Sequence, residues 1–378
     1  MVTHKPRARD LGLPFPGCPG PHNAITDVPG VRVGVCTLTD PARRMRTGVT
    51  AILPRDDRDV PRPVLAGQFT LNGNGEMTGT HWIQDAGYFV GPVCITNTHA
   101  VGMVHHAATR WMIERYDAYF ATNHAWAMPV VAETYDGVLN DINALHVTEA
   151  HARAALEAAT AGPVPEGSTG GGNGMICYGF KGGTGTSSRR VATAGGDWTV
   201  GALVQANHGA RPWLNILGVP VGRLLPDGAP DDRERGSIIV VLATDAPLSP
   251  LSLRHLARRA AIGIGRNGTP GGNDSGDLFL AFSTADAGAI PQRAGPVIQR
   301  QEVNPEHIDP LYLAAVEAVE EAVVNALVAG EDVPTVKPPG KICPALDTAR
   351  VVALFARQAL RGGDDGGNDG GDGRSGGR

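Results

Sequence analysis

A serine at the start of an apolar run is the residue best placed to do chemistry in this chain. Residues 238–243 are all β-branched or aliphatic and predict a buried strand. Residues 226–235, immediately upstream, are polar and charged and predict an exposed loop. Scission between Gly236 and Ser237 would give Ser237 a free α-amine, whose reference pKa of about 7.7–8.0 suits a base near neutral pH. The same dipeptide also occurs in ordinary turns, so it does not decide the function alone.

Polar side chains stand at the ends of two further apolar runs. Asn207 ends the run 200–206, where a carboxamide can donate to a developing oxyanion. Ser275 and Asp277 precede the run 278–283, and their spacing of two places them on one face of a strand. A hydroxyl and a carboxylate placed in this way can move a proton beside a nucleophile. Both patterns also fit turns with local side-chain hydrogen bonds.

A third polar group follows the apolar residues 129–131 and contains Glu133, Asp136 and Asp141. A carboxylate here can bind the ammonium group of a substrate. Solvated loop acids are the other interpretation of the same pattern.

Two glycine-rich segments, 72–79 and 170–187, invite a nucleotide-binding hypothesis. Neither has the GxGxxG spacing at a strand-to-helix turn, and neither matches a P-loop. The twelve histidines form no HExxH motif, and His105 and His106 would point about 100° apart on a helix. The sequence therefore predicts neither phosphate binding nor a metal, and no cofactor.

The elements that must position these residues alternate between strands and helices, which predicts an α/β or α+β layered domain. Ser249-Pro250 and Asp309-Pro310 are typical helix starts, and Thr148 is a candidate N-cap. Strands are predicted at 31–35, 49–53, 93–96, 175–180, 200–206, 238–243 and 278–283, and helices at 105–119, 148–161, 250–264, 309–329 and 347–360.

The composition narrows the class of protein. Among 378 residues, 42% are hydrophobic and the net charge is −5, which predicts a sizeable core and no nucleic-acid or membrane partner. No apolar stretch reaches 18 residues, and the N-terminus does not resemble a secretory signal. Five cysteines without a paired pattern predict reduced thiols in a cytoplasmic protein. Residues 362–378 are almost all Gly, Asp, Asn, Ser and Arg and predict a disordered tail.

Sequence segments that follow one another in the same order along most of the chain resemble one family, the DmpA-type aminopeptidases. These include L-aminopeptidase/D-esterase-amidases and β-peptidyl aminopeptidases. The resemblance covers about residues 10–360, and it includes Arg-Gly-Ser-Ile-Ile at 235–239 and Ser-Gly-Asp-Leu-Phe-Leu-Ala-Phe-Ser-Thr at 275–284. Further similar segments are 23–34, 73–79, 95–98, 132–141, 179–189 and the residue Asn207.

The resemblance implies a four-layer αββα sandwich, similar to the N-terminal-nucleophile hydrolases but with different strand connectivity. It implies one domain over residues 1–361, cut between Gly236 and Ser237 into chains 1–236 and 237–378 and assembled as a homotetramer of such pairs. Position by position, Ser237 matches the nucleophile, Asn207 the oxyanion donor, Ser275 and Asp277 the assisting pair, and Glu133 the acid that binds the substrate amine.

The implied activity is release of N-terminal residues from small peptides, amides or esters through an acyl-enzyme on Ser237. Some β-peptide-cleaving members carry Glu where this chain has Asp277. Two alternatives stand beside this hypothesis. One is an acyltransferase of the ornithine-acetyltransferase type, although its Ala-Thr-Met-Leu-like nucleophile segment is absent here. The other is a non-catalytic protein that retains the fold.

Overall fold

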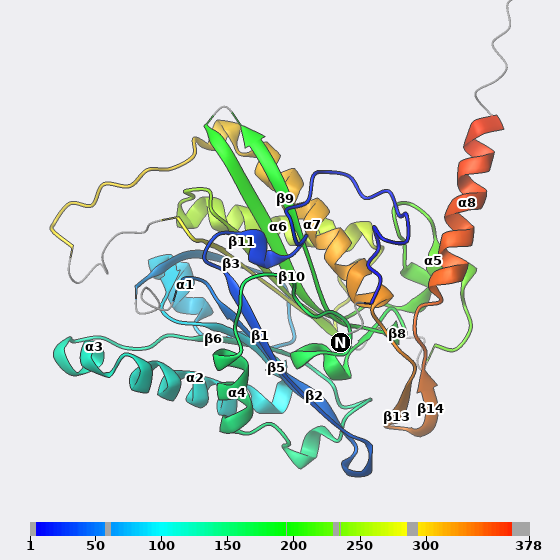
Figure 1. Ribbon diagram of the computed structural model, residues 1–378, viewed down its shortest axis with the longest axis horizontal. Helices are drawn as coiled ribbons and strands as arrows, with labels where there is room; N and C mark the ends of the chain where they lie inside the picture. The colour runs from blue at the N-terminus through cyan, green and yellow to red at the C-terminus, as the bar shows by residue number, and fades with distance from the viewer. Residues whose placement is uncertain are drawn as a thin grey trace, which may run out of the picture.

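The computed structural model describes residues 5–56, 62–193, 195–229, 234, 236–285 and 294–364, and two β-sheets lie at its centre (Figure 1). The smaller sheet has four strands in the order β1-β2-β5-β6. Helices α2 (Val101–Arg115) and α4 (Glu149–Glu157) pack on this sheet. Its strands are β1 (Arg32–Asp40), β2 (Met45–Leu53), β5 (Val93–Asn97) and β6 (Val130–Thr134).

The larger sheet has six strands in the order β4-β3-β12-β11-β10-β9. Helix α6 (Pro250–Arg266) packs on β3 and β12, and α7 (Asp309–Val328) packs on β9 and β10. The strands are β4 (Tyr88–Phe89), β3 (Val64–Gly73), β12 (Gly276–Ser283), β11 (Ser237–Thr244), β10 (Gly196–Asn207) and β9 (Gly183–Thr193).

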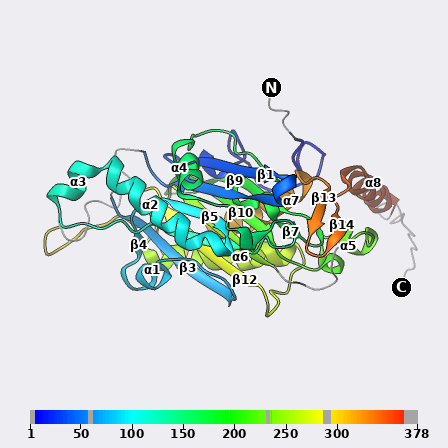
Figure 2. The same cartoon turned by 90° about the horizontal axis from the view of Figure 1, so that it is seen from below.

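The side chains of β11 show how the layers are held together. Ile239, Val241 and Ala243 belong to the apolar cluster between the two sheets, which includes residues of β5 and β6. The alternate residues Ile238, Val240 and Leu242 belong to the cluster that includes the apolar faces of α6 and α7. A central strand is therefore buried on both faces, and the predicted αββα sandwich is confirmed (Figure 2).

Two parallel strand pairs explain why each sheet has helices on its outer face. Strand β5 pairs with β6, and β11 pairs with β12, both in parallel. Parallel neighbours require a crossover, supplied by α2 and α3 (Asp117–Thr122) in the first pair and by α6 in the second. As predicted, α6 begins at Pro250 with Ser249 as its N-cap, whose hydroxyl accepts a hydrogen bond from the Ser252 N–H.

Smaller elements lie around the four layers. Hairpin β13–β14 (Val333–Val336 and Pro339–Cys343) is followed by α8 (Thr348–Asp364), which extends away from the body (Figure 1). The remaining elements are α1 (Thr80–Ala86), α5 (Val221–Leu224), β7 (Ile176–Cys177) and β8 (Phe180–Lys181). Within the described ranges, none of the helices combines the length and apolarity needed to span a membrane.

Three predicted elements differ from the structure. The single strand predicted at 175–180 is wrong, because Tyr178 and Gly179 adopt positive φ angles of 50° and 68° and turn the chain into the hairpin β7–β8. The helix predicted at 148–161 ends at Glu157, because Thr160 pairs with Val33 of β1. The helix predicted at 105–119 is two helices, α2 and α3.

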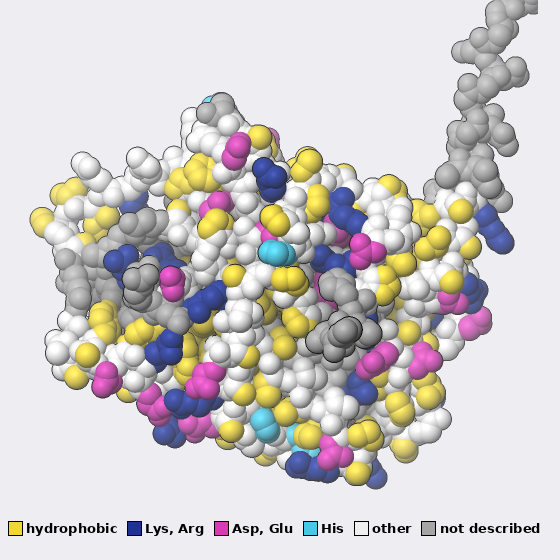
Figure 3. Space-filling view, in the orientation of Figure 1, with side chains coloured by type: hydrophobic (Ala, Val, Ile, Leu, Met, Phe, Trp, Pro, Cys, Tyr) yellow, Lys and Arg dark blue, Asp and Glu magenta, His cyan; other side chains and the backbone are white. Residues whose placement is uncertain are grey.

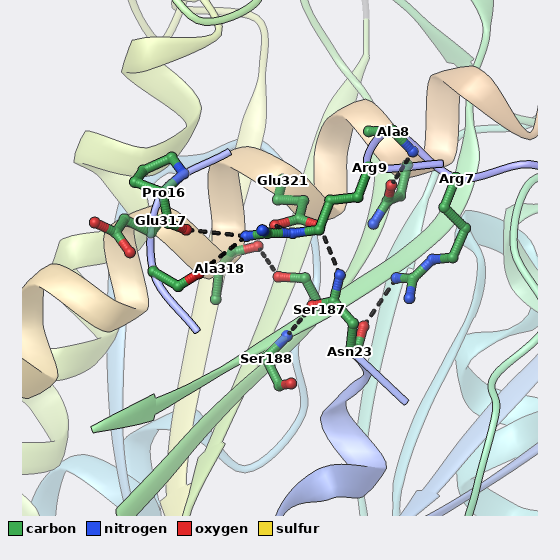
Figure 4. Close-up of polar contacts among 12 residues, drawn as sticks. Arg7, Ala8, Arg9, Pro16, Asn23, Ser187, Ser188, Glu317, Ala318 and Glu321 are labelled. Carbon is green, nitrogen blue, oxygen red and sulfur yellow. Dashed lines mark hydrogen bonds and ion pairs between the residues drawn. The ribbon is translucent and has the colours of Figure 1, made fainter. Parts of the chain in front are cut away.

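Strand β9 was not predicted, and it carries buried polar side chains. Ser187 donates to the Ala318 carbonyl of α7 at 2.6 Å, and the Arg189 guanidinium lies 2.7 Å from Glu321. Figure 4 shows Arg9 and Asn23 of the N-terminal segment converging on the same Glu321 carboxylate. This network attaches the N-terminal segment to the outer helix layer.

The expected disordered tail, 362–378, lies outside the described residues from position 365 onward. Helix α8 runs to Asp364, four residues beyond its expected end at 360.

Candidate active site

The ends of three neighbouring strands bring the predicted catalytic residues together. Strand β11 lies between β10 and β12 in the larger sheet. Because β10 is antiparallel to β11, its last residue, Asn207, is the register partner of the first residue of β11, Ser237. Because β12 is parallel to β11, its start lies at the same end, with Asp277 in register with Ile238.

Ser237 is buried, with 7% of its surface exposed. As the first residue of β11 it shares the inter-sheet side of the strand with Ile239 and Val241. Its Oγ accepts a hydrogen bond from the Gly276 backbone N–H at 3.0 Å. This bond leaves the hydroxyl proton available for transfer to a base.

Gly236 packs directly against Asn207. A methyl group at position 236 would lie 1.5 Å from the Asn207 carbonyl oxygen and 3.1 Å from its Nδ2, so a side chain is excluded there. The Asn207 Nδ2 donates to the Tyr135 carbonyl at 3.0 Å, and its Oδ1 accepts from the Ile176 N–H at 2.8 Å. Both contacts orient the carboxamide, with its nitrogen on the Gly236 side.

Ser275 and Asp277 form a buried pair on either side of Gly276. The Ser275 hydroxyl donates to Asp277 Oδ1 at 2.6 Å, and Asn72 Nδ2 of β3 donates to Oδ2 at 3.3 Å. Burial raises the pKa of Asp277 to about 6, although the hydrogen bonds from Ser275 and Asn72 oppose the shift. The pair is connected to Ser237 through the Gly276 N–H, and its carboxyl group titrates close to neutral pH.

Glu133 lies on β6, across the inter-sheet space from the larger sheet. Its carboxylate accepts hydrogen bonds from the Glu76 N–H at 2.9 Å and from the Thr98 hydroxyl. A methyl group at Gly75 would lie 3.1 Å from Glu133 Oε1 and 3.6 Å from the Gly276 Cα, so Glu133 and Gly276 flank the same glycine. Burial raises the pKa of Glu133.

A cavity of about 150 Å³ lies beside the Gly236-Ser237 bond. Of the predicted site residues, Asn207 and Gly236 line it, whereas Ser237, Glu133, Ser275 and Asp277 do not. The β13–β14 hairpin closes one side of it. The cavity is lined by Tyr135, Val138, Gly174, Ile176, Gly179, Asn207, His208, Gly209, Gly236, Thr335, Lys337, Pro338 and Lys341.

Glu234 is a site residue that was not predicted from the sequence. The predicted exposed loop 226–235 is described only at 226–229, which is largely exposed, and at 234, which is half-buried. The Glu234 carboxylate accepts hydrogen bonds from the backbone N–H groups of Gly209 at 2.8 Å and Gly272 at 3.0 Å. Loop composition gave no signal for these partners, because they lie 25 and 38 residues away in the chain.

Asp136 and the glycine-rich segment 170–174, which the sequence patterns also singled out, have structural contacts and lie outside the group of predicted catalytic residues. Asp136 is fully buried and accepts hydrogen bonds from Asn97 and Asn140, each at 3.0 Å. Residues 170–174 form a buried 3-10 helix, where a methyl group at Gly171 would lie 2.2 Å from Gln205 Oε1 of β10 and 2.6 Å from the Ile95 carbonyl oxygen of β5. This segment therefore packs closely against both sheets.

An αββα sandwich with a serine at the start of a central strand defines a class of protein, the hydrolases with an N-terminal-nucleophile-like fold. The model of peptidase family S58 matches residues 23–338. The chain belongs to this family, and it is a hydrolase that acts on peptide bonds. The expected relationship to the DmpA-type aminopeptidases is thereby confirmed.

Similar proteins carry related names. The chain is 49% identical over 351 residues to the β-peptidyl aminopeptidase BapA of Sphingosinicella microcystinivorans, covering 86% of each chain. It is 58% identical to the L-aminopeptidase D-Ala-esterase/amidase of Ochrobactrum anthropi, described as a prototype of the serine aminopeptidases with a variant of the Ntn hydrolase fold. That structure gives a TM-score of 0.89 and covers 94% of this chain and 99% of its own. A Burkholderia sp. β-aminopeptidase gives a TM-score of 0.85 at 48% identity, covering 93% and 99%.

Proposed function

We propose that this chain is a self-processing serine aminopeptidase that releases N-terminal residues from small peptides, amides or esters through an acyl-enzyme on Ser237. The observation that carries the proposal is the register pairing of Ser237 with Asn207, with Gly236 packed against Asn207. This arrangement puts a hydroxyl, a carbonyl carbon and an amide donor at one strand end.

Self-cleavage uses the intact chain as the first substrate. The Ser237 Oγ attacks the Gly236 carbonyl carbon, and the C–N bond between the two residues breaks to give an ester. The hydroxyl proton passes to the released amine by way of the Ser275–Asp277 pair, and water hydrolyses the ester. The products are residues 1–236, ending in a carboxylate, and residues 237–378, beginning with the free amine of Ser237.

The mature enzyme repeats the attack on an external substrate. The Ser237 hydroxyl attacks the carbonyl of the substrate's first residue, and Asn207 Nδ2 donates to the oxyanion. The bond from this carbonyl to the leaving amine or alcohol breaks as the leaving group takes the proton, and water then hydrolyses the acyl-enzyme and frees the Ser237 hydroxyl. Glu133 binds the substrate's ammonium group, which restricts cleavage to the first residue and makes the enzyme an exopeptidase. The leaving group extends into the cavity beside the β13–β14 hairpin.

The proposal and the substrate range are tested with a panel of L-, D- and β-aminoacyl anilides, amides and esters. The panel is assayed with the wild-type protein and with Ser237→Ala. We expect release of the amine or alcohol by the wild-type protein and none by Ser237→Ala, which stays a single chain. The proposal is wrong if the Ser237→Ala protein hydrolyses the panel at the wild-type rate.

We also propose that the cleaved pair assembles as a homotetramer in the cytoplasm. Each of the five cysteines is a free thiol, as suits a reducing compartment. Light scattering coupled to size-exclusion chromatography tests the assembly, and a mass of one αβ pair would contradict it.

A further inference from the structure

A carboxylate just upstream of the Gly236-Ser237 bond connects the ends of both strands that flank β11. Glu234 Oε1 accepts the Gly209 N–H at 2.8 Å and the Thr269 hydroxyl at 3.2 Å, and its Oε2 accepts the Gly272 N–H at 3.0 Å. Gly209 follows Asn207 at the end of β10, and residues 269–272 lead into Ser275 and β12. One side chain thus contacts both segments that supply the other site residues.

The surroundings of Glu234 are shaped to its carboxylate. A methyl group at Gly272 would lie 2.1 Å from Oε2, so the backbone approaches closely only because this residue is glycine. Gly209 has a φ of +83°, a left-handed conformation that glycine adopts without strain. Hydrogen bonds from backbone N–H groups to a carboxylate are charge-assisted and stronger than neutral ones.

An ordinary structural salt bridge does not explain Glu234. Among the described residues its carboxylate forms no ion pair, and its three partners are neutral donors. Three buried glutamates of α7, Glu317, Glu320 and Glu321, pair with arginines at 2.7–3.2 Å, whereas Glu133 of the site, like Glu234, is held by neutral donors. Glu234 is therefore anchored by backbone dipoles at the site rather than by a partner charge.

Self-cleavage demands accurate placement of the scissile carbonyl. Attack requires the nucleophile and carbonyl carbon to be held about 3–3.5 Å apart, and small displacements cost large factors in rate. Residues 226–228, the described start of the preceding loop, are exposed and lie eight or more residues before the bond. Glu234, two residues before Gly236, is the nearest described anchor upstream of the bond.

We propose that Glu234 is a positioning residue for self-cleavage: by accepting hydrogen bonds from Gly209, Thr269 and Gly272, it holds the Gly236 carbonyl against the Ser237 hydroxyl. This inference rests on the proposed self-processing function. In that reaction the Gly236 carbon gains a bond to Ser237 Oγ and loses its bond to the Ser237 nitrogen, which takes the proton. Glu234 exchanges no atoms, and it no longer holds a scissile carbonyl once the bond is cut.

The test compares Glu234→Ala, Glu234→Gln and the control Asp227→Asn, which alters an exposed carboxylate on the same segment. Each chain is made by cell-free translation, and its cleaved fraction is followed over time. We expect Glu234→Ala to cleave itself at least about tenfold more slowly than wild type. Glu234→Gln should be intermediate, since its amide keeps one accepting oxygen, and Asp227→Asn should match wild type.

A second readout separates positioning from general damage. In material that has finished cleavage, Glu234→Ala should lower kcat for a peptide substrate by a smaller factor than it lowers the rate of self-cleavage, because Glu234 still contacts Gly209 and Gly272 but no longer holds a scissile carbonyl. The inference is overturned if Glu234→Ala cleaves itself at the wild-type rate, or if the cleaved variant loses turnover in proportion. A wild-type chain that stays intact would instead overturn the self-processing function and this inference with it.

Discussion

At the scale of single residues, the site combines a buried nucleophile with a carboxyl group whose pKa is raised. In the uncut chain the Ser237 nitrogen is an amide and cannot act as a base. The Ser275–Asp277 pair, joined by a 2.6 Å hydrogen bond, is the proton acceptor proposed for self-cleavage. After the cut the Ser237 amine is free, so either this amine or the Ser275–Asp277 pair can take the proton during turnover.

The pH dependence of self-cleavage tests this assignment. Asp277 has a pKa of about 6 because it is buried, so it is protonated below pH 6 and ionised above. Charging it costs more in the folded state than in the unfolded state, so its effect on stability is unfavourable above pH 6 and fades as the pH falls. We expect the self-cleavage rate to rise with pH through about 6 and then level off. Chains from cell-free translation, transferred to buffers from pH 4.5 to 8, provide the measurement, and a rate that falls over this interval would contradict it.

Substitution of Glu133 should weaken the binding of peptide substrates without slowing self-cleavage. The scissile segment of the intact chain has no free ammonium group, whereas an aminopeptidase substrate has one. Hydrogen bonds to charged groups contribute about 1.5–3 kcal/mol, so Glu133→Gln should raise KM for peptides about 10- to 100-fold. The variant should still cut itself, as seen by gel electrophoresis. A wild-type KM in this variant would show that Glu133 does not bind the substrate's ammonium group.

At the scale of elements, glycines set how closely the helices approach the sheets. A methyl group at Gly185 of β9 would lie 2.0 Å from the Ala322 carbonyl oxygen of α7. Helix α7 therefore rests directly on the strand, and this contact helps to fix the sheet that carries Asn207 and Ser237.

Gly185→Ala should therefore push α7 away from the sheet. We expect the free energy of unfolding to fall by about 1–3 kcal/mol, as for other overpacked cores. Gly102→Ala in α2 is the matched control, since a methyl group there meets no atom within 4 Å and should stabilise the helix by about 0.5–1 kcal/mol. Urea unfolding in a Ser237→Ala background keeps the chain continuous. Equal effects of the two substitutions would contradict the close packing.

Elements with strong local signals were predictable from sequence, and those held by distant contacts were not. Strand β11 and helix α6 stand out because apolar residues and a Ser-Pro start mark them. Strand β9 does not, because Ser187 and Arg189 are polar and find their partners more than 100 residues away on α7. The residue roles came from the family resemblance, and the adjacency of the three strand ends came from the structure, since strand order is a long-range property.

At the scale of the whole molecule, buried charges join the N-terminal segment to the outer helices. Glu321 is fully buried and accepts hydrogen bonds from Arg9, Asn23 and Arg189. On the face shown in Figure 3, acidic and basic side chains are interspersed rather than gathered into a patch of one sign. The buried network, rather than the surface charges, should therefore dominate the electrostatic part of stability.

Removing Glu321 should cost stability far more than removing a surface acid. Glu321→Ala leaves the buried Arg189 without its nearest carboxylate, and breaking a buried pair typically costs about 3–5 kcal/mol. Glu114, which pairs with Arg153 on the surface, provides the control, and its substitution by Gln should change little. Denaturant unfolding in the Ser237→Ala background compares the two. A similar loss in both variants would contradict the importance of the buried network.

The central claim is that Ser237 becomes an N-terminal nucleophile by self-cleavage. Intact-mass spectrometry of the purified wild-type protein, with N-terminal sequencing of its fragments, tests this most directly. We expect two fragments, one ending at Gly236 and one beginning with Ser237, and a single uncut chain for Ser237→Ala. A single uncut wild-type chain with full amidase activity would contradict it.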